Sequence, residues 1–243
     1  MQTKGINSQE KVLKLLNIKK MKTLKFTAIV VLAFNMLNLN SQVVSLEKSN
    51  LEPVQVSMSL EKLAGKNVVK VIKDPAIKEV DQPTFVKIKG TNFRNGTIEV
   101  SVLSKLLPQA PELARGFIGV SFRINDDNSK FENIYIRPTN GRADDQLRRN
   151  RSIQYFSFPD FPFSKTRQET PGKYESYADM ALNEWIKLKI VVKDSKAQLF
   201  INDSKQPCLI VNDLKLGADA SGAIGLWVDV GTEGYFADLK VYE

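Results

Sequence analysis

The fold is decided by two short stretches near the carboxyl end, Trp185-Ile-Lys-Leu-Lys-Ile-Val-Val192 and Ala197-Gln-Leu-Phe-Ile-Asn202. Over most of both stretches, aliphatic residues alternate with polar or aromatic residues. Such alternation places the apolar side chains on one face of a strand and the others on the opposite face. Each stretch therefore predicts a half-buried β-strand, of the kind found in antiparallel sheets with one face on the core.

The same pattern extends over most of the 243-residue chain. From Asn67 onward, short runs rich in Val, Ile and Phe are each closed by Gly, Pro, Asn or Asp, and turn residues such as Asn95-Gly96 stand between them. No long helical pattern intervenes, so the sequence predicts an all-β, two-sheet antiparallel jelly-roll sandwich that forms one domain over residues 67–243. The predicted strands are 68–73, 84–89, 96–103, 116–125, 132–137, 152–156, 185–192, 197–202, 208–211, 223–228 and 235–242.

The first 66 residues differ from the rest. Residues 21–41 begin with Met-Lys-Thr-Leu-Lys and continue in an uncharged apolar run too short to span a bilayer, which predicts a signal peptide with a short leader helix. Residues 1–20 are either a misassigned start or an extended basic region before the signal. The sequence pattern of residues 42–66 indicates a tether or lid. Within it, residues 59–65 are predicted to form one or two helical turns that end at Gly65. The expected product is exported, periplasmic or secreted, and has no membrane span.

Composition excludes several kinds of chemistry. The chain has no histidine and a single cysteine, Cys208, so sites that need histidine, an intramolecular disulfide and multi-cysteine metal sites are all excluded. Residues 1–41 hold seven lysines and one glutamate, so most of the net charge of +8 lies there and residues 42–243 carry only +2. The basic character of the whole chain is therefore no argument for a nucleic-acid partner, and none is expected.

The stretch Phe131-Glu-Asn-Ile-Tyr-Ile-Arg-Pro138 predicts a strand with two unlike faces. Glu132 shares one face with two isoleucines, whereas Asn133, Tyr135 and Arg137 share the other. A face that presents Asn, Tyr and Arg together suits a solvated sheet that meets a ligand. The alternative is the plain outer face of a sandwich.

A polar loop at residues 139–152 is rich in arginine. It contains Arg142, Arg148, Arg149 and Arg151 beside two aspartates. Guanidinium groups bind carboxylates and sulfates through paired hydrogen bonds, so the loop could recognise an anionic sugar. The alternative is that the arginines and aspartates only pair with one another.

An aromatic segment follows directly, Gln154-Tyr-Phe-Ser-Phe-Pro-Asp-Phe-Pro-Phe163. Aromatic rings beside convergent polar groups can pack against the apolar face of a pyranose ring. The segment could instead be a hydrophobic plug that seals one end of the sandwich, because Phe has no polar group to offer a ligand.

Without histidine, catalysis would rest on carboxylates or on tyrosine and arginine. Glycoside hydrolysis needs two carboxyl groups across one bond, and a lyase could use Tyr135 as the base while Arg137 neutralises a uronate carboxylate. The candidate carboxyl groups are Glu132, Asp144, Asp145, Asp160, Glu169 and Glu175. No cofactor is expected beyond a weak case for calcium at the loop acids Asp126, Asp127 and Asp219, which are otherwise solvated turn residues.

Several strand motifs, in this order along the chain, resemble the concanavalin A-like lectin/glucanase superfamily, and within it exported bacterial domains related to laminin-G-like modules and 3-keto-disaccharide hydrolases. The resemblance covers about residues 80–243. The motifs are Gly116-Phe-Ile-Gly-Val-Ser-Phe-Arg123, Phe131 to Pro138, Glu184 to Val192, Ala197 to Asn202, Gly222-Ala-Ile-Gly-Leu-Trp227 and Tyr235-Phe-Ala-Asp-Leu-Lys-Val241.

The resemblance implies a curved sheet whose concave face binds carbohydrate, but it does not imply a mechanism. The alternating Glu and Asp pattern of the laminarinase-type branch is missing, and so is the histidine that lyases of this fold place beside Tyr and Arg. Glu132 and Arg137 lie on the strand that resembles the sugar-facing strand of the family.

The sequence thus predicts an exported protein that binds or processes a poly- or oligosaccharide, neutral or anionic. As an enzyme it would be a glycoside hydrolase or polysaccharide lyase, with Glu132, Tyr135 and Arg137 as catalytic residues. The remaining class is a structural or protein-interaction sandwich without sugar affinity. The predicted sugar-binding residues are Asn133, Arg142, Gln154 and Tyr155.

Overall fold

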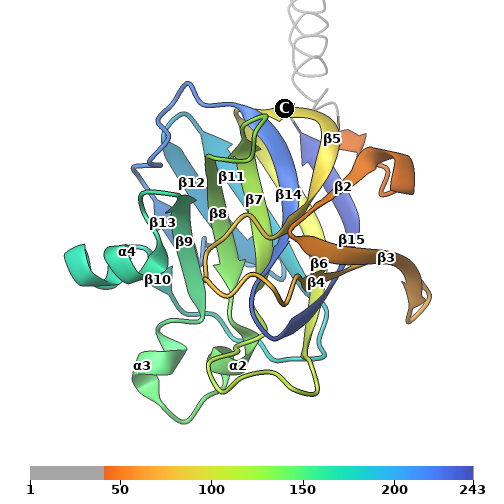
Figure 1. Ribbon diagram of the computed structural model, residues 1–243. Helices are drawn as coiled ribbons and strands as arrows, with labels where there is room; N and C mark the ends of the chain where they lie inside the picture. The colour runs from red at the N-terminus through yellow and green to blue at the C-terminus, as the bar shows by residue number, and fades with distance from the viewer. Residues whose placement is uncertain (1–40, 243) are drawn as a thin grey trace, which may run out of the picture. The chain divides into compact units, whose positions relative to one another are not determined.

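Two antiparallel sheets pack face to face in the computed structural model, which describes residues 41–242 (Figure 1). The first sheet consists of β1 (Ser41–Val43), β3 (Val56–Leu63), β4 (Lys66–Lys73), β6 (Gly96–Leu106), β11 (Ile186–Lys193), β12 (Lys196–Ile201), β13 (Leu209–Val211) and β15 (Thr232–Tyr242). These strands lie in the order β13-β12-β11-β6-β15-β4-β3, and β1 pairs with the end of β15.

The second sheet holds the strands that position the candidate site. It consists of β2 (Leu51–Val54), β5 (Phe85–Phe93), β7 (Ile118–Ile124), β8 (Phe131–Ile136), β9 (Ile153–Phe158), β10 (Glu175–Ser176) and β14 (Gly222–Val228). Its order is β10-β9-β8-β7-β14-β5-β2, so β8 lies near the middle with β7 and β9 beside it.

Helices in the described part of the chain are few and short. They are the 3-10 helix η1 (Lys48–Asn50) and the α-helices α2 (Pro138–Gly141), α3 (Gln146–Arg149) and α4 (Phe163–Glu169). The α2 and α3 helices connect β8 to β9 at one end of the sandwich, at the bottom of Figure 1, and α4 follows β9. The predicted all-β, two-sheet antiparallel sandwich is confirmed, and each of the eleven predicted strands has a counterpart. The predicted leader helix lies outside the described residues.

The prediction of helical turns at residues 59–65 is wrong. Residues 51–54 and 56–63 are the strands β2 and β3, and β3 forms a hairpin with β4 in which Leu63 pairs with Lys66. Ala64 and Gly65 form the two-residue turn, with φ angles of 50° and 80°. A two-residue hairpin turn and the end of a helix both use glycine at positive φ, so Gly65 alone could not distinguish them. Part of the expected tether thus contributes strands to both sheets.

The two sheets differ in how their strands are buried. In β11, buried residues alternate with partly or fully exposed ones, as a strand with one solvated face requires. In β7 and β8, by contrast, every residue is buried. One face of these central strands packs against the first sheet, so loops must cover the other face.

Aromatic side chains fill this covered outer face of the second sheet. The main members of the cluster are Phe85, Phe131, Tyr135, Phe156 and Trp227. The Trp227 ring centroid lies 4.9 Å from that of Tyr135 and 5.6 Å from that of Phe156. Trp227 Nε1 donates a hydrogen bond of 2.9 Å to the carbonyl oxygen of Gln82, in the connection from β4 to β5. These rings are therefore packed under a loop and do not form an open platform for a sugar.

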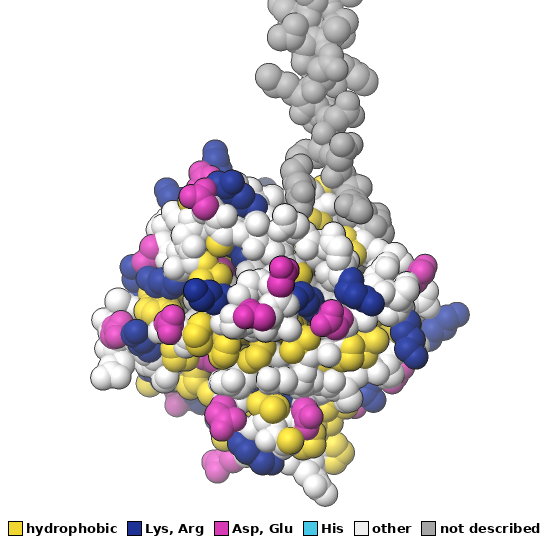
Figure 2. Space-filling model, turned by 45° about the horizontal axis from the view of Figure 1, so that its top comes forward, with side chains coloured by type: hydrophobic (Ala, Val, Ile, Leu, Met, Phe, Trp, Pro, Cys, Tyr) yellow, Lys and Arg dark blue, Asp and Glu magenta, His cyan; other side chains and the backbone are white. Residues whose placement is uncertain are grey.

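Charged side chains of both signs are interspersed on the face shown in Figure 2. Hydrophobic side chains form a band across the same face. The mixture of signs agrees with the small net charge of residues 42–243.

Candidate functional site: an arginine-lined pocket

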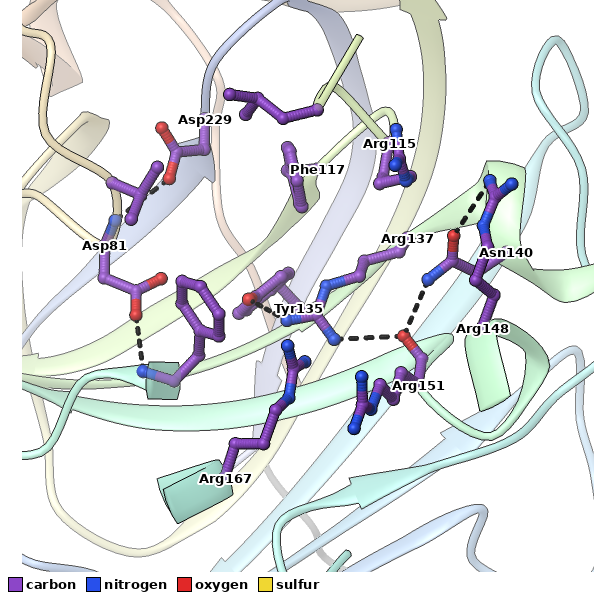
Figure 3. A pocket seen from close by; sticks show the side chains of 13 residues that line it. Asp81, Arg115, Phe117, Tyr135, Arg137, Asn140, Arg148, Arg151, Arg167 and Asp229 are labelled. Atoms are coloured by element: carbon purple, nitrogen blue, oxygen red, sulfur yellow. Dashed lines mark hydrogen bonds between the residues drawn. The ribbon is translucent and has the colours of Figure 1, made fainter. Parts of the chain in front are cut away.

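A cavity of about 260 Å³ lies beside the aromatic cluster (Figure 3). It opens at the end of the second sheet where the strands β8 and β14 end and β7 begins. Antiparallel neighbours place the end of one strand beside the start of the next, which gathers the segments around residues 117, 137 and 229. The cavity is lined by Val80, Asp81, Leu113, Arg115, Phe117, Tyr135, Arg137, Asn140, Arg148, Arg151, Phe163, Arg167 and Asp229.

Arg137 is the most firmly held of the five arginines that line the cavity. Its Nη2 donates to the hydroxyl of Tyr135 at 2.6 Å, and its Nη1 donates to the carbonyl oxygen of Arg151 at 3.0 Å (Figure 3). Nη2 also donates to Gln154 Oε1 at 3.2 Å. Only 5% of its side chain is exposed. Arg137 is therefore a fixed positive charge at the base of the pocket.

A single carboxylate, Glu175, is shared by three of the arginines. Its oxygens lie 3.5 Å from Arg137 Nη1, 3.5 Å from Arg151 Nε and 2.5 Å from Arg167 Nη2. The Glu175 side chain is 4% exposed, so these charges interact with little screening by water. One carboxylate cannot neutralise three guanidinium groups, and this side of the pocket keeps an excess of positive charge.

The other two arginines, Arg115 and Arg148, form no salt bridge within the described residues. Arg115 Nη1 donates to the backbone carbonyls of Glu112 and Ala114, and Arg148 Nη2 donates to Asn140 Oδ1 at 3.5 Å. Burial lowers the pKa of Arg115, and the nearby charges of Arg148 and Arg137 lower it further. The charge of Glu112 opposes this lowering in part, and neither Arg115 nor Arg148 forms a salt bridge with an acid among the described residues, which suits an anionic ligand.

The opposite wall of the cavity is acidic. Asp81 Oδ2 accepts a hydrogen bond of 2.6 Å from the backbone amide of Phe163. Asp229 forms a buried ion pair of 2.6 Å with Lys73 and also accepts a bond of 3.0 Å from the backbone amide of Asp81. Burial raises the pKa of Asp81 to about 7, and the nearby Asp229 acts in the same direction, against the opposing effect of the hydrogen bond from Phe163.

Aromatic rings form the remaining walls. The guanidinium carbon of Arg137 lies 4.9 Å from the ring centroid of Tyr135 and 5.7 Å from that of Phe163, and the guanidinium of Arg167 lies 5.1 Å from the same Phe163 ring. Phe117 packs edge-on to Tyr135. Such contacts orient the guanidinium groups while leaving apolar ring surface beside them.

The structure brings together only some of the residues predicted from the sequence. Tyr135 and Arg137 both line the cavity, on the strand face where the sequence placed them. Gln154 lies behind Arg137 and is fully buried, so it supports the arginine and does not line the pocket. Asn133 shares the face of Tyr135 but is buried, with no hydrogen-bond partner for its Nδ2, and it too is absent from the lining.

The structure separates Glu132 and Tyr155 from the pocket. Both residues project from the opposite strand face, where Tyr155 donates a hydrogen bond of 2.6 Å from its hydroxyl to Glu132 Oε2. Glu132 Oε1 accepts a further bond of 2.8 Å from the backbone amide of Leu216. The structure thus does not bring Glu132 and Tyr155 together with Tyr135 and Arg137, because strand alternation directs the two pairs to opposite sides of the sheet.

Arg142 also lies outside the pocket. It lies on the surface, where its guanidinium forms paired hydrogen bonds with Asp179 at 2.9 and 3.0 Å and with Glu184 at 2.8 and 3.2 Å. Two carboxylates already neutralise this arginine. Arg148 and Arg151, from the same loop, line the pocket instead.

Four charged pocket residues were missed by the sequence reasoning: Asp81, Arg115, Arg167 and Asp229. They come from four connections that are far apart in the chain. No local pattern marks them, because Asp81, Arg115 and Asp229 lie in loops and Arg167 lies in the short helix α4.

The described residues contain no group of three or more acidic or cysteine side chains that could hold a metal ion. Of the acids considered for calcium, Asp127 accepts hydrogen bonds from the amide and hydroxyl of Ser129, and Asp219 pairs with Arg94. Over residues 41–242, no helix has the length and hydrophobicity needed to cross a membrane.

Comparison with solved structures finds proteins of similar architecture at low sequence identity. The carbohydrate-binding module CBM66 from Bacillus subtilis is 13% identical and has a TM-score of 0.53, over 79% of this chain and 95% of that one. A putative glycosyl hydrolase from Parabacteroides distasonis is 12% identical with a TM-score of 0.49, over 84% of this chain and 99% of that one. No protein-family profile matches the sequence, and no curated protein is significantly similar to it.

The described residues thus form a two-sheet antiparallel β-sandwich with the same fold as this carbohydrate-binding module. At 13% identity, the likeness to the carbohydrate-binding module defines the fold alone. The function has to be argued from the pocket.

Proposed function

We propose that this protein binds a poly- or oligosaccharide through a sugar unit that carries a carboxylate or a sulfate, held in the arginine-lined pocket. The main support is the group of five arginines around one cavity, of which Arg115 and Arg148 form no salt bridge among the described residues. Planar guanidinium groups bind carboxylate and sulfate oxygens in pairs, and burial strengthens such bonds. An anionic group would offset the excess positive charge of the site.

The size and walls of the pocket favour a sugar ring. A cavity of about 260 Å³ is smaller than the roughly 300 Å³ at which drug-sized pockets begin, so it suits one ring rather than several. Phe117, Tyr135 and Phe163 offer apolar surface to the C–H face of a pyranose. The printed name of the similar structure, a carbohydrate-binding module, supports the same proposal.

Binding is favoured over hydrolysis and over lyase chemistry. Asp81 and Asp229 are the only carboxylates among the lining residues, and both belong to one wall, whereas a hydrolase needs carboxyl groups on both sides of the bond. The two oxygens of Asp229 already accept bonds from Lys73 and from backbone amides. Burial also raises the pKa of Tyr135 well above its usual range, which opposes its use as a base. The proposed setting is outside the cell, after removal of the signal peptide predicted at residues 21–41.

Calorimetric titration of the purified protein tests this proposal. The ligands are oligomers of glucuronate or galacturonate, a sulfated oligosaccharide and their neutral counterparts. We expect an anionic ligand to bind at least tenfold more tightly than its neutral counterpart, and the difference to shrink as salt is added. Equal affinity for the charged and neutral members of every pair would refute the proposal.

Two neighbouring arginines provide a matched pair of variants. Arg148 lines the cavity, whereas Arg149 lies over the ring of Tyr177, outside the lining. Arg148→Gln should weaken binding of the anionic ligand about tenfold, and Arg149→Gln, which removes the same charge one position away, should change it less than twofold. Mass spectrometry of the incubated ligands separates binding from turnover, because fragments with an added water indicate a hydrolase and unsaturated fragments a lyase.

A further inference from the structure

One carboxyl oxygen in the pocket has no partner. Asp81 is 3% exposed, and its Oδ2 is occupied by the backbone amide of Phe163. Its Oδ1 accepts no hydrogen bond within residues 41–242 and faces the cavity, on the wall opposite Arg115 and Arg148 (Figure 3). This oxygen is not among the fully buried polar atoms that lack a partner, so solvent reaches it through the pocket, and a ligand hydroxyl that donates to it takes the place of water.

The protein fixes this carboxyl group with an unusual arrangement. The backbone of Asp81 has a φ of 56°, in the left-handed region that residues other than glycine seldom adopt. Its backbone amide donates a hydrogen bond of 3.0 Å to Asp229 Oδ2. Asp229 in turn forms an ion pair of 2.6 Å with the buried Lys73. Backbone strain that is maintained by a buried ion pair is typical of groups with a positional role.

We infer that Asp81 accepts a hydrogen bond from a ring hydroxyl of the bound sugar, across the ring from the anionic group that the arginines hold. This inference rests on the proposed function and narrows it. The ligand then has two unlike edges, an anionic edge toward Arg115 and Arg148 and a hydroxyl edge toward Asp81. Sugar acids that lack this hydroxyl, or carry it in the other orientation, would be bound weakly.

The arrangement of charge explains why the two edges cannot be exchanged. A ligand carboxylate beside Asp81 and Asp229 would meet like charge, whereas a ligand hydroxyl beside the arginines would leave their donors without an anion. Only one orientation of the ring satisfies both walls. Asp81 is thus a specificity-determining residue, and it does not supply the main binding energy.

The test compares a sugar acid with its deoxy analogues. The probes are D-glucuronate and D-galacturonate, each with its 2-, 3- and 4-deoxy derivatives, titrated at pH 8 into the wild-type protein and into Asp81→Asn. Asparagine tolerates positive φ, and its amide oxygen can still accept from Phe163, which leaves the NH2 group, a donor, facing the pocket. In the wild-type protein, removal of one particular hydroxyl should weaken binding at least about tenfold. In Asp81→Asn that loss should be at least about threefold smaller, because the hydroxyl then accepts a neutral hydrogen bond from the NH2 group and no longer donates to a carboxylate.

The possible outcomes separate this inference from the proposed function. A preference for anionic sugars that survives in Asp81→Asn, together with a smaller deoxy penalty than in the wild type, supports both the proposed function and the role of Asp81. The same deoxy penalty in both proteins, or no penalty in the wild type, overturns the role of Asp81 and leaves the anionic-sugar proposal standing. If neither glucuronate nor galacturonate binds better than glucose or galactose, and no sulfated sugar does, both proposals fail.

A second measurement needs no variant. The charged groups that face Asp81 are Asp229, Arg137 and Lys73. Because a carboxylate accepts a hydrogen bond more strongly than a protonated carboxyl group, the wild-type deoxy penalty should shrink when the pH is lowered from 8 to 6. An unchanged penalty over this range would contradict the assignment to Asp81.

Discussion

The buried carboxyl group of Asp81 makes a quantitative prediction about stability. Its pKa is raised from 3.8 to about 7, chiefly by burial. The folded protein therefore binds this proton more tightly than the unfolded chain does, and between these two pH values it holds more protons. Since stability falls with rising pH wherever the native state holds more protons, the contribution of Asp81 to the free energy of unfolding should decrease between pH 4 and pH 7.

The size of the effect follows from the pKa difference. The pKa differs by about three units between the folded and unfolded states. At roughly 1.4 kcal/mol per unit, the contribution of Asp81 to the free energy of unfolding should fall by about 4 kcal/mol between pH 4 and pH 7. Above about pH 7 the contribution should be constant, because Asp81 is then ionised in both states. Asp81→Asn cannot ionise, so the free energy of unfolding of the wild type relative to this variant should drop by about 4 kcal/mol from pH 4 to pH 8.

Urea unfolding followed by tryptophan fluorescence measures this difference, since Trp227 is fully buried. The contributions of other acids cancel in the comparison of wild type with Asp81→Asn at each pH. Asp144→Asn, at an exposed carboxylate in the α2 to α3 connection, is the control and should retain the wild-type slope. A stability difference between wild type and Asp81→Asn that stays constant from pH 4 to pH 8 would refute the assignment of a raised pKa to Asp81.

Three further substitutions test the fold and the limits of the pocket. A Cβ at Gly119 would lie 2.3 Å from the carbonyl oxygen of Ile134, so Gly119→Ala should separate β7 from β8 and lower stability by about 3 kcal/mol in thermal unfolding. Glu132→Gln leaves either Tyr155 or a backbone amide without an acceptor; it should lower stability by about 2 kcal/mol while ligand affinity stays within twofold. Arg142→Ala removes an exposed charge outside the cavity, and it should change affinity less than twofold and stability by less than about 1 kcal/mol. A tenfold loss of ligand affinity in Glu132→Gln or Arg142→Ala would show that the substituted residue contributes to the binding site.

The central strands were predictable because their period is a local property. Residues 186–193 show alternating burial in the structure as they show alternating polarity in the sequence. The period also placed Tyr135 and Arg137 on one face and Glu132 on the other, and the structure agrees. The amino-terminal strand β3 was missed because a glycine that ends a helix resembles a glycine that closes a hairpin.

The site could be predicted only in part. The arginine loop gave Arg148 and Arg151 as candidates beside Arg142, but whether an arginine pairs with surface acids or faces a cavity depends on distant segments. Arg142 is neutralised by Asp179 and Glu184, which lie more than 30 residues further along the chain. The residues of the aromatic segment also have different environments, which depend on distant segments. Phe156 is packed in the buried aromatic cluster, whereas Phe163 lines the pocket.

The sequence by itself determined the strand pattern, the sandwich class and the chemistry that the protein lacks, because polarity period, composition and the absence of histidine are properties of the chain alone. The tertiary structure alone decided where charge accumulates. It gathers Asp81, Arg115, Arg167 and Asp229 from four separate connections around the end of β8. It also closes a loop over Trp227. Burial then raises the cost of each unpaired charge, and that cost, which no local sequence encodes, is the physical basis of the anion preference that we propose for this pocket.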